Sequence, residues 1–398
     1  MDNRARRRRK RRKQVAAALL AVIPRPRHIQ HCRPRLDWDR VVERLLLEGE
    51  FERVNRMSPS SFNRLCRAVV PVLRRLEHSW LESQGISMKN KIHLAVRYLA
   101  GGAIDDIRRV IGSSHSYAYS ITVSVMEAIA DAPKLGITFP LSSTQCSLAA
   151  AAFQARSEEG VFNGYVAALD GWLCHIKAPS ELDAGSVGPR LYFSGHYMHY
   201  GINVQACCDA FSRFVFIEAT HPGGTNDARA YGESDLAAVI ERLGRGLYVV
   251  ADAAYTATNR LLTPFVALKR TDPDFLKKDS FNFHLSQLRI CVEMAFGLLV
   301  RKWAIFKRPL ELCLKNATLA IKFAAVLHNF VVTERLVSSK DPVHEDLCAF
   351  ARRHGRSIES VMSYERDNEC ADEVGVSFTR QGLVDKLSGL NLLRPHQQ

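Results

Sequence analysis

The spacing of apolar residues divides the chain into a helical stretch followed by a stretch of mixed strands and helices. Between residues 36 and 135, apolar residues recur three and four positions apart, which predicts amphipathic helices. One helix is expected to begin at Ser58-Pro59, where a capping residue precedes a proline suited to the first turn. Further helices are predicted at residues 88–99, 104–111 and 115–130. This stretch is therefore expected to be all-α.

The last two of these helices are separated by a glycine-containing turn at Gly112, which is the spacing of a helix-turn-helix. In that interpretation the second helix begins with exposed polar residues that can contact DNA phosphates or base edges. These residues are Ser113, Ser114, His115, Ser116, Tyr117 and Tyr119, of which Ser114, His115 and Tyr117 are the candidate DNA contacts. The alternative is an ordinary helical domain that never contacts DNA, because the same geometry is common there.

Residues 160–330 show a different pattern, in which strands and helices are mixed. Strands are predicted at 165–176, 200–206 and 214–219, the last two forming a hairpin through a turn at 209–213. A strand at 246–252 is almost wholly apolar, as is typical of a strand buried on both faces of a sheet. Helices are predicted at 227–243 and 285–303. The expected fold class of this stretch is α/β.

Three carboxylates stand out by their place in these elements. Asp170 ends the apolar half of the first strand, Asp252 ends the buried strand, and Glu293 lies in the middle of the last helix. Side chains so placed can converge, and their hard oxygen donors suit Mg²⁺ or Mn²⁺. Two such ions would activate an attacking oxygen and stabilise the leaving one. The alternatives are that each Asp is a turn former or helix cap, and that Glu293 pairs with Arg289 one helical turn earlier.

Two further acids are interpreted as structural. Asp209 is predicted to be a hairpin-turn residue. Asp227 is predicted to stand at a helix start, where the helix dipole favours a negative charge. Neither is expected to belong to the metal site.

The charge of the chain is concentrated at its start. Thirteen basic residues and a single acid place +12 of the net charge of +14 in residues 1–35, so the remaining residues are almost neutral. Basic runs of this kind serve as nuclear localisation signals or nucleic-acid arms, and the candidate DNA contacts here are Arg6, Arg7, Arg8, Arg9 and Lys10. The alternatives are a solvated tail, a signal peptide with its apolar run at 15–23, and a transit peptide.

Cysteine spacing and hydropathy narrow the class of protein further. The chain has ten cysteines but no CxxC pair, which argues against a zinc cluster or disulfide framework and favours a reducing compartment. No apolar run approaches the roughly 18–20 residues that a membrane helix needs. A membrane partner is therefore not expected.

A series of motifs, in the same order along the chain as in a known family, gives residues 160–330 a family resemblance. They are ALDGWLCHIKAP at 168–179, HYGINVQACCDAFSRFVF at 199–216, HPGGTNDARAY at 221–231, VVADAAY at 249–255, LLTPF at 261–265, FNFHLSQLRICVEMAFGLLVRKWAIF at 281–306 and LHNF at 327–330. Together they resemble the nuclease domain of PIF/Harbinger-type DDE transposases and of the Harbinger-derived nucleases domesticated from them. The helical stretch resembles the family's N-terminal part in KIHLAVRYLAGGAIDDIRRVIGSSHSYAYSI at 91–121.

The resemblance implies an RNase H-like nuclease domain, with a mixed sheet flanked by helices, at residues 136–335. It is preceded by the helix-turn-helix-like segment at 36–135 and the basic leader at 1–35, and followed by a tail at 336–398 with a helix around 383–393. Carried over by motif, Asp170, Asp252 and Glu293 form a catalytic Asp-Asp-Glu triad that binds Mg²⁺, for which Mn²⁺ can substitute. The family further implies a Myb-like DNA-binding partner protein that assists nuclear import and DNA recognition.

The chain departs from the family pattern at three positions that are not metal ligands. Trp172 stands where the family usually has Thr, Ala254 where it has Gly, and Val300 where it often has Lys. Arg301 and Lys302 are the candidate substitutes for the missing cation as DNA contacts.

These observations predict a metal-dependent DNA nuclease or transposase that cleaves phosphodiesters and can join strands. The alternative is a catalytically inactive, domesticated DNA-binding or partner-recruiting protein that kept the fold. A third interpretation, a ribonuclease or structure-specific nuclease, shares the site and differs only in substrate. The nucleus is the expected compartment, with the cytoplasm second, and a homo-oligomer is an open alternative to a monomer.

Overall fold

The structure is a computed structural model that describes residues 35–76, 85–338, 344–362 and 380–395. Leu36–Gln398 form one compact unit. The leader's candidate DNA contacts, Arg6 to Lys10, lie outside the described residues. The boundary between the helical and α/β segments remains a prediction.

The first part of the compact unit is helical, as the apolar spacing predicts. Its elements are α2 (Trp38–Leu47), α3 (Phe51–Asn55), α4 (Pro59–Leu76), α6 (Met88–Leu99), α7 (Ile104–Ile111), α8 (His115–Ala130) and the 3₁₀ turn η1 (Pro133–Leu135). The Ser58 hydroxyl accepts a hydrogen bond from the Ser61 N–H at 3.2 Å and so caps α4 as expected. Between α7 and α8, Gly112 has φ 71°, a left-handed conformation that glycine adopts without strain.

The start of α8 is less exposed than the sequence predicts. Helix α8 packs against α4, α6 and α7 and also against α14 (Leu314–Val337), which is distant in sequence. Ser113 and Tyr117 are therefore buried, at 1% and 8% exposure, and the expectation that both are exposed is wrong. The Ser114 hydroxyl accepts from the Tyr117 N–H at 3.2 Å, so it caps the helix. Of the three candidate DNA contacts here, Ser114 and His115 are exposed.

The second part is a mixed sheet with the order β2–β3–β1–β5–β6, and β4 also pairs with β3. Its strands are β1 (Tyr165–His175), β2 (Phe193–Ser194), β3 (His199–Cys208), β4 (Phe214–Pro222), β5 (Tyr248–Val250) and β6 (Leu261–Leu262). Strand β1 runs antiparallel to β3 and parallel to β5. Strand β5 is wholly buried, as its apolar sequence predicts.

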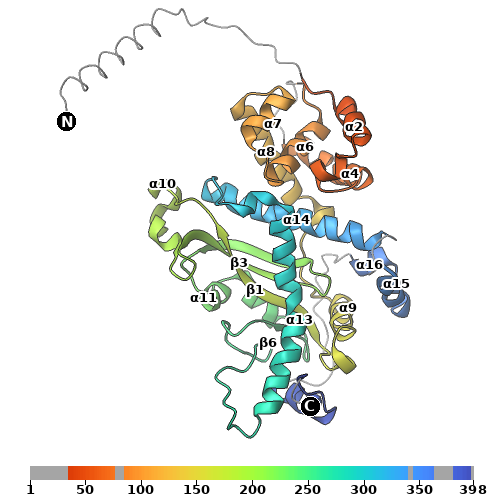
Figure 1. The fold of residues 1–398 in the computed structure, drawn as a ribbon, viewed down its shortest axis with the longest axis vertical. Helices are drawn as coiled ribbons and strands as arrows, with labels where there is room; N and C mark the ends of the chain where they lie inside the picture. Colours follow the sequence, from red (N-terminus) through yellow and green to blue (C-terminus); the bar gives the residue numbers. More distant parts are fainter. Residues whose placement is uncertain (1–34, 77–84, 339–343, 363–379, 396–398) are drawn as a thin grey trace, which may run out of the picture. The chain divides into compact units, whose positions relative to one another are not determined.

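Helices flank the sheet. They are α9 (Ser143–Gln154), α10 (Glu181–Ala184), α11 (Asp227–Gly232), α12 (Asp235–Glu241), α13 (Phe275–Lys302) and α14, with short 3₁₀ turns η2 (Glu158–Gly160), η3 (Gly185–Val187), η4 (Pro189–Tyr192) and η5 (Ala304–Lys307). Helix α13 packs against β1 and β3, and its course past these strands is visible in Figure 1. The described part of this segment is therefore α/β, with a mixed sheet flanked by helices.

Two helix boundaries differ from the prediction. The helix expected at 227–243 is two helices, because Ser234 is extended, with ψ 156°, at the N-cap position of the second one. The helix expected to begin at residue 285 begins ten residues earlier, at Phe275, directly after the chain turns at Asp272 and Pro273. Polar residues in the first three turns of α13 interrupt the helical spacing of apolar residues, so the sequence does not predict this part of the helix.

Helices α13 and α14 are long and apolar enough to cross a membrane by length and composition alone. In this structure, however, their apolar residues contribute to the hydrophobic core, including Val292 and Leu299 of α13 and Ala324 and Leu327 of α14. Helix α14 packs on β4 and α8. Both helices are thus accounted for as core elements.

The tail adds α15 (His344–Arg353), α16 (Ile358–Met362) and α17 (Arg380–Gly389). Helix α17 packs on α13 and buries Leu383, Val384 and Leu387 in the core, which fits an ordinary closing element. The eight cysteines that the structure describes are free, and Cys207 and Cys208 are buried in β3 as expected.

Candidate active site

Parallel pairing of β1 with β5 brings the first two candidate acids to the same level of the sheet. Ala168 of β1 is the partner of Val250 of β5. Asp170 and Asp252 each lie two residues beyond this pair, and alternate residues of a strand point to the same face. The two carboxylates therefore stand side by side at the carboxyl end of the buried strand.

Helix α13 carries the third acid, Glu293, and also an arginine that links Glu293 to Asp170. Arg289 Nη1 donates to Asp170 Oδ2 at 3.1 Å, and its Nη2 donates to Glu293 Oε1 one helical turn away. The side chains of Arg289 and Asp170 are only 18% and 20% exposed, whereas that of Glu293 is 49% exposed, so the bridge runs from the protein interior to its surface. The alternative interpretation in which Glu293 pairs with Arg289 is correct, and the same guanidinium also ties Glu293 to Asp170.

The electrostatics show that Asp170 interacts with both other acids and that Arg289 interacts with all three. Burial raises the pKa of Asp170 from 3.8 to about 6; Arg289 opposes this shift, whereas Asp252 and Glu293 add to it. Burial lowers the pKa of Arg289, but Asp170, Glu293 and Asp252 more than offset it, so that its pKa is raised overall. The structure therefore brings the three predicted carboxylates into one electrostatic cluster around a single internal cation.

The loop after β5 fixes Asp252 in place. Asp252 Oδ1 accepts a hydrogen bond from the backbone N–H of Ala254 at 2.9 Å. The family resemblance implies glycine at the position of Ala254, but the φ of Ala254 is not left-handed. The alanine is therefore accommodated without backbone strain, and this departure does not disturb Asp252.

A fourth carboxylate, Asp227, lies beside the cluster and was not expected there. It is the first residue of α11, as predicted, but its Oδ1 also accepts from Asn203 Nδ2 at 2.9 Å and from Gln205 Nε2 at 3.1 Å. The Tyr255 hydroxyl completes the network by donating to Gln205 Oε1 at 2.7 Å. Burial raises the pKa of Tyr255, and the carboxylates of Asp227, Asp170 and Asp252 raise it further, so all three lie near its hydroxyl.

Gly171 makes the approach of Asp227 to β1 feasible. A Cβ atom at residue 171 would lie 2.4 Å from Asp227 Oδ1, which is too close for any other residue. The glycine after Asp170 was a visible signal that something approaches the strand closely at this point. The sequence alone did not show that the approaching group is a carboxylate.

The donor set fits a hard divalent cation, because all four acidic side chains offer carboxylate oxygens. Within the described residues, no three His, Cys, Asp or Glu side chains form a ready metal-ligand group. Arg289 lies where its guanidinium neutralises Asp170 and Glu293. Binding of a cation by both carboxylates therefore requires this side chain to move.

The remaining candidates lie away from the carboxylates. Arg301 and Lys302 line a separate cavity at the end of α13. Trp172, the departure next to Gly171, packs against Phe296 and Phe306 at ring-centroid distances of 5.6 and 5.5 Å. Asp209 accepts from the Phe211 and Arg213 backbone N–H groups at 2.9 and 3.0 Å, which confirms it as the hairpin-turn residue.

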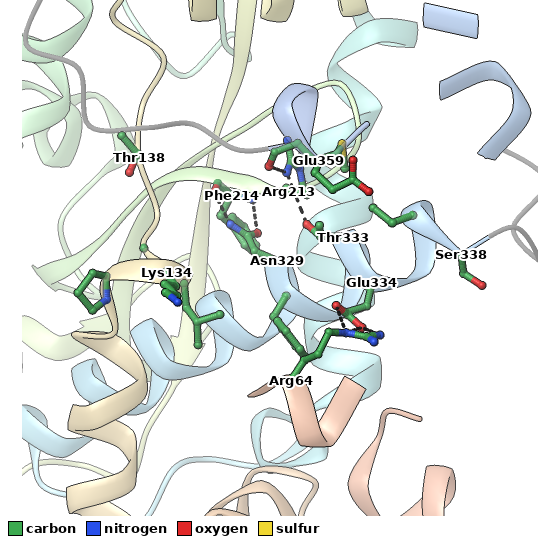
Figure 2. A pocket seen from close by; sticks show the side chains of 16 residues that line it. Arg64, Lys134, Thr138, Arg213, Phe214, Asn329, Thr333, Glu334, Ser338 and Glu359 are labelled. Atoms are coloured by element: carbon green, nitrogen blue, oxygen red, sulfur yellow. Dashed lines mark hydrogen bonds and ion pairs between the residues drawn. The ribbon is translucent and has the colours of Figure 1, made fainter. Parts of the chain in front are cut away.

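A cavity of about 950 Å³ is also distinct from the carboxylate cluster. Arg64 is paired with Glu334 and Arg213 with Asp209, and Lys134 and Glu359 are the other charged residues of the lining. Figure 2 shows the first of these pairs, together with the hydrogen bonds of Asn329 to the Phe214 backbone. Asp170, Asp227, Asp252 and Glu293 do not belong to its lining, so this cavity is separate from the predicted site.

Residues 169–329 match the sequence model of the DDE superfamily endonucleases. Over this segment the chain is similar to a DDE endonuclease. The match covers about two fifths of the chain and contains all four carboxylates described above. It supports a DDE transposase family and hence a nuclease or transposase, a class that generally uses divalent metals and has DNA as substrate. Comparison with curated proteins and with solved structures gave no match.

Proposed function

We propose that the protein is a metal-dependent DNA nuclease or transposase whose active site is Asp170, Asp252 and Glu293. The observation that carries the proposal is the convergence of the three acids around Arg289. They come from two adjacent parallel strands and from the helix that packs against one of them, inside a segment similar to DDE endonucleases. The order and placement of these acids also support an RNase H-like nuclease fold of PIF/Harbinger type.

The three carboxylates would hold Mg²⁺, or Mn²⁺ in its place, with Asp227 as a neighbouring acid. Bound there, such ions supply a nucleophile at neutral pH and stabilise charge on the attacking and leaving oxygens. The chain's own residues preorganise the site: Gly171 lets Asp227 approach β1, and Asn203 and Gln205 hold its carboxylate. Water or a DNA 3′-OH would attack the phosphodiester in line.

Arg289 has two roles in this proposal. Without metal it offsets the repulsion between Asp170 and Glu293, so that the two acids remain close together. With metal it would be released from at least one of them, and a free guanidinium beside the site could contact the phosphate being cleaved.

The biological setting follows from the same proposal. We expect the basic leader to contribute nuclear import and non-specific DNA affinity, and Ser114 and His115 to contact DNA. We also propose a Myb-like DNA-binding protein as partner and a homo-oligomer as the form that acts on two DNA ends. Deletion of residues 1–35 should then flatten the salt dependence of DNA binding.

The test is nicking of supercoiled plasmid by purified full-length protein with Mg²⁺, Mn²⁺ or EDTA. Asp170→Asn, Asp252→Asn and Glu293→Gln should each abolish nicking, whereas Asp235→Asn should not, since Asp235 is an exposed acid at the start of α12. Equal nicking by all variants would locate the activity elsewhere. A lack of cleavage even with the specific DNA ends and partner protein would favour the inactive, DNA-binding alternative.

A further inference from the structure

A second cavity, of about 290 Å³, lies where the ends of α13 and α14 meet Arg56, the residue that follows α3. It is lined by Arg56, Leu298, Arg301, Lys302, His328, Val331, Val332 and Arg335. Four of these eight residues are Lys or Arg, and none is acidic. The cavity therefore concentrates positive charge in a part of the chain that is otherwise nearly neutral.

The cations act on one another inside this cavity. Burial lowers the pKa of Lys302 to about 8, Arg335 and Arg56 lower it further, and Glu52 outside the lining opposes them. His328 contributes no charge near neutral pH, since burial lowers its pKa to about 4. Repulsion between the cavity's Lys and Arg side chains costs free energy, and an anion bound between them would offset that repulsion.

Arg56 supplies an independent sign of a missing acceptor. Its Nε is buried and has no hydrogen-bond partner among the residues that the structure describes. Its φ of 60° belongs to the end of α3, where Arg56 is the C-cap residue, and helices commonly end in this conformation. A buried N–H donor normally has a partner, so the unsatisfied Nε of Arg56 points to a ligand that supplies an oxygen.

We propose that this cavity binds a phosphate group of a nucleic-acid backbone. A phosphate offers several strong acceptors and a negative charge, which match guanidinium and ammonium donors. Arg301 and Arg335 are exposed whereas Arg56 and Lys302 are half-buried, so the cavity opens to a macromolecule from its rim. The choice of nucleic acid as the source of the phosphate rests on the proposed function.

The phosphate site is distinct from the carboxylate site on the same helix. Lys302 follows Glu293 by nine residues, which is about 13.5 Å along the axis and half a turn around it. A strand bound at the cavity therefore contacts the opposite side of α13 from the carboxylates. Arg56 belongs to the helical segment, so the bound phosphate would also join that segment to α13 and α14.

The test compares two variants that remove the same number of charges. Arg301→Gln/Lys302→Gln removes two cations from the cavity, and Arg74→Gln/Arg75→Gln removes two exposed cations at the end of α4. Binding of a labelled DNA duplex to the full chain is measured in EDTA over a range of KCl concentrations. We expect the cavity variant to bind about 10-fold more weakly and its salt slope to fall by about 1 to 2. The α4 variant should bind within about 2-fold of wild type.

Inorganic tripolyphosphate distinguishes a free phosphate compound from nucleic acid as the occupant. It should raise the Tm of the wild type, compete with DNA, and have neither effect on the cavity variant. If the cavity variant loses stabilisation by tripolyphosphate but binds DNA like the α4 variant, a free phosphate compound is the occupant and the proposal is overturned. Equal behaviour of the two variants with both probes would also overturn it.

Two further controls make these outcomes independent of folding and of cleavage. Arg301→Glu reverses one exposed charge at the rim and should weaken DNA binding without lowering the Tm. Binding in EDTA requires no cleavage, so a chain that binds DNA through the cavity but never nicks it would refute the nuclease proposal alone. A chain that nicks DNA and binds it equally well without the cavity cations would refute the phosphate site alone.

Discussion

Helix α13 carries two regions of opposite charge, a cluster of carboxylates and a cluster of cations. Around Glu293, several carboxylates are gathered and Arg289 compensates them within the chain. Around Lys302, four cations line a cavity whose lining contains no acid. The first region is held together before any ligand arrives, whereas the second gathers cations at one cavity. In the two proposals, the carboxylate site exchanges an internal cation for a metal, and the cavity takes an anion from outside.

The largest expected effect is a loss of DNA cleavage without a loss of DNA affinity when a carboxylate of the site is removed. Asp252→Asn removes a negative charge but keeps the shape of the side chain and its acceptor for the Ala254 N–H. We expect plasmid nicking to fall by at least about 100-fold, as for loss of a metal ligand or its support. DNA affinity in EDTA should stay within about 2-fold of wild type. A parallel loss of affinity and nicking would mean that Asp252 acts in DNA binding.

The next effect concerns Arg289 as the internal cation. Arg289→Ala leaves Asp170 and Glu293 facing each other without compensation, and we expect the metal-free protein to lose about 2–3 kcal/mol of unfolding free energy. Mg²⁺ should then raise the Tm more in this variant than in wild type. Arg229→Ala, which breaks the exposed Arg229–Glu233 pair, is the matched control and should leave the Tm unchanged. Equal Mg²⁺ effects in Arg289→Ala and wild type would contradict the exchange of cations.

The close approach of Asp227 to β1 can be tested at Gly171. Gly171→Ala places a methyl group 2.4 Å from Asp227 Oδ1, so the carboxylate must shift, at a cost of about 1–3 kcal/mol. Gly232→Ala is the control, since a Cβ there meets nothing within 4 Å. Denaturant unfolding measures both variants. If they are equally stable, Asp227 is not held against the strand.

The smallest expected effect is a pH-dependent gain of stability. Because the folded pKa of Asp170 is raised from 3.8 to about 6, its ionised form destabilises the metal-free fold above pH 6. Asp170→Asn should therefore be more stable than wild type by about 1–2 kcal/mol at pH 7. The difference should shrink as the pH falls from 6 and vanish below about pH 4, where Asp170 is protonated in both states. A difference that does not change with pH would exclude ionisation of Asp170 as its cause.

The sequence predicts much of this fold because local signals agree with the tertiary contacts. The helices at 88–99, 104–111 and 115–130 have the predicted ends, since caps and glycines mark them. Tyr117 was predicted on the wrong side of its helix, because α14, about 200 residues later, belongs to the surroundings that bury α8. Contacts between elements so far apart leave no local signal.

The two charged regions also differ in how far the sequence predicts them. Asp170, Asp252 and Glu293 end or occupy recognisable elements, so their convergence could be anticipated from the chain. Asp227 has an ordinary role at a helix start, and its second role depends on Asn203, Gln205 and the missing side chain of Gly171. Arg301 and Lys302 were predicted as DNA contacts, but the cavity that they line could not be anticipated, because Arg56 and Lys302 come together only in the folded protein.

The most direct test of the metal site is calorimetric titration of the full-length protein with Mn²⁺. Wild type and Asp235→Asn should bind Mn²⁺ alike, because Asp235 lies outside the site. Asp170→Asn, Asp252→Asn and Glu293→Gln should each lose most of that binding. If all five proteins bind Mn²⁺ equally, or none does, the three carboxylates are not a metal site.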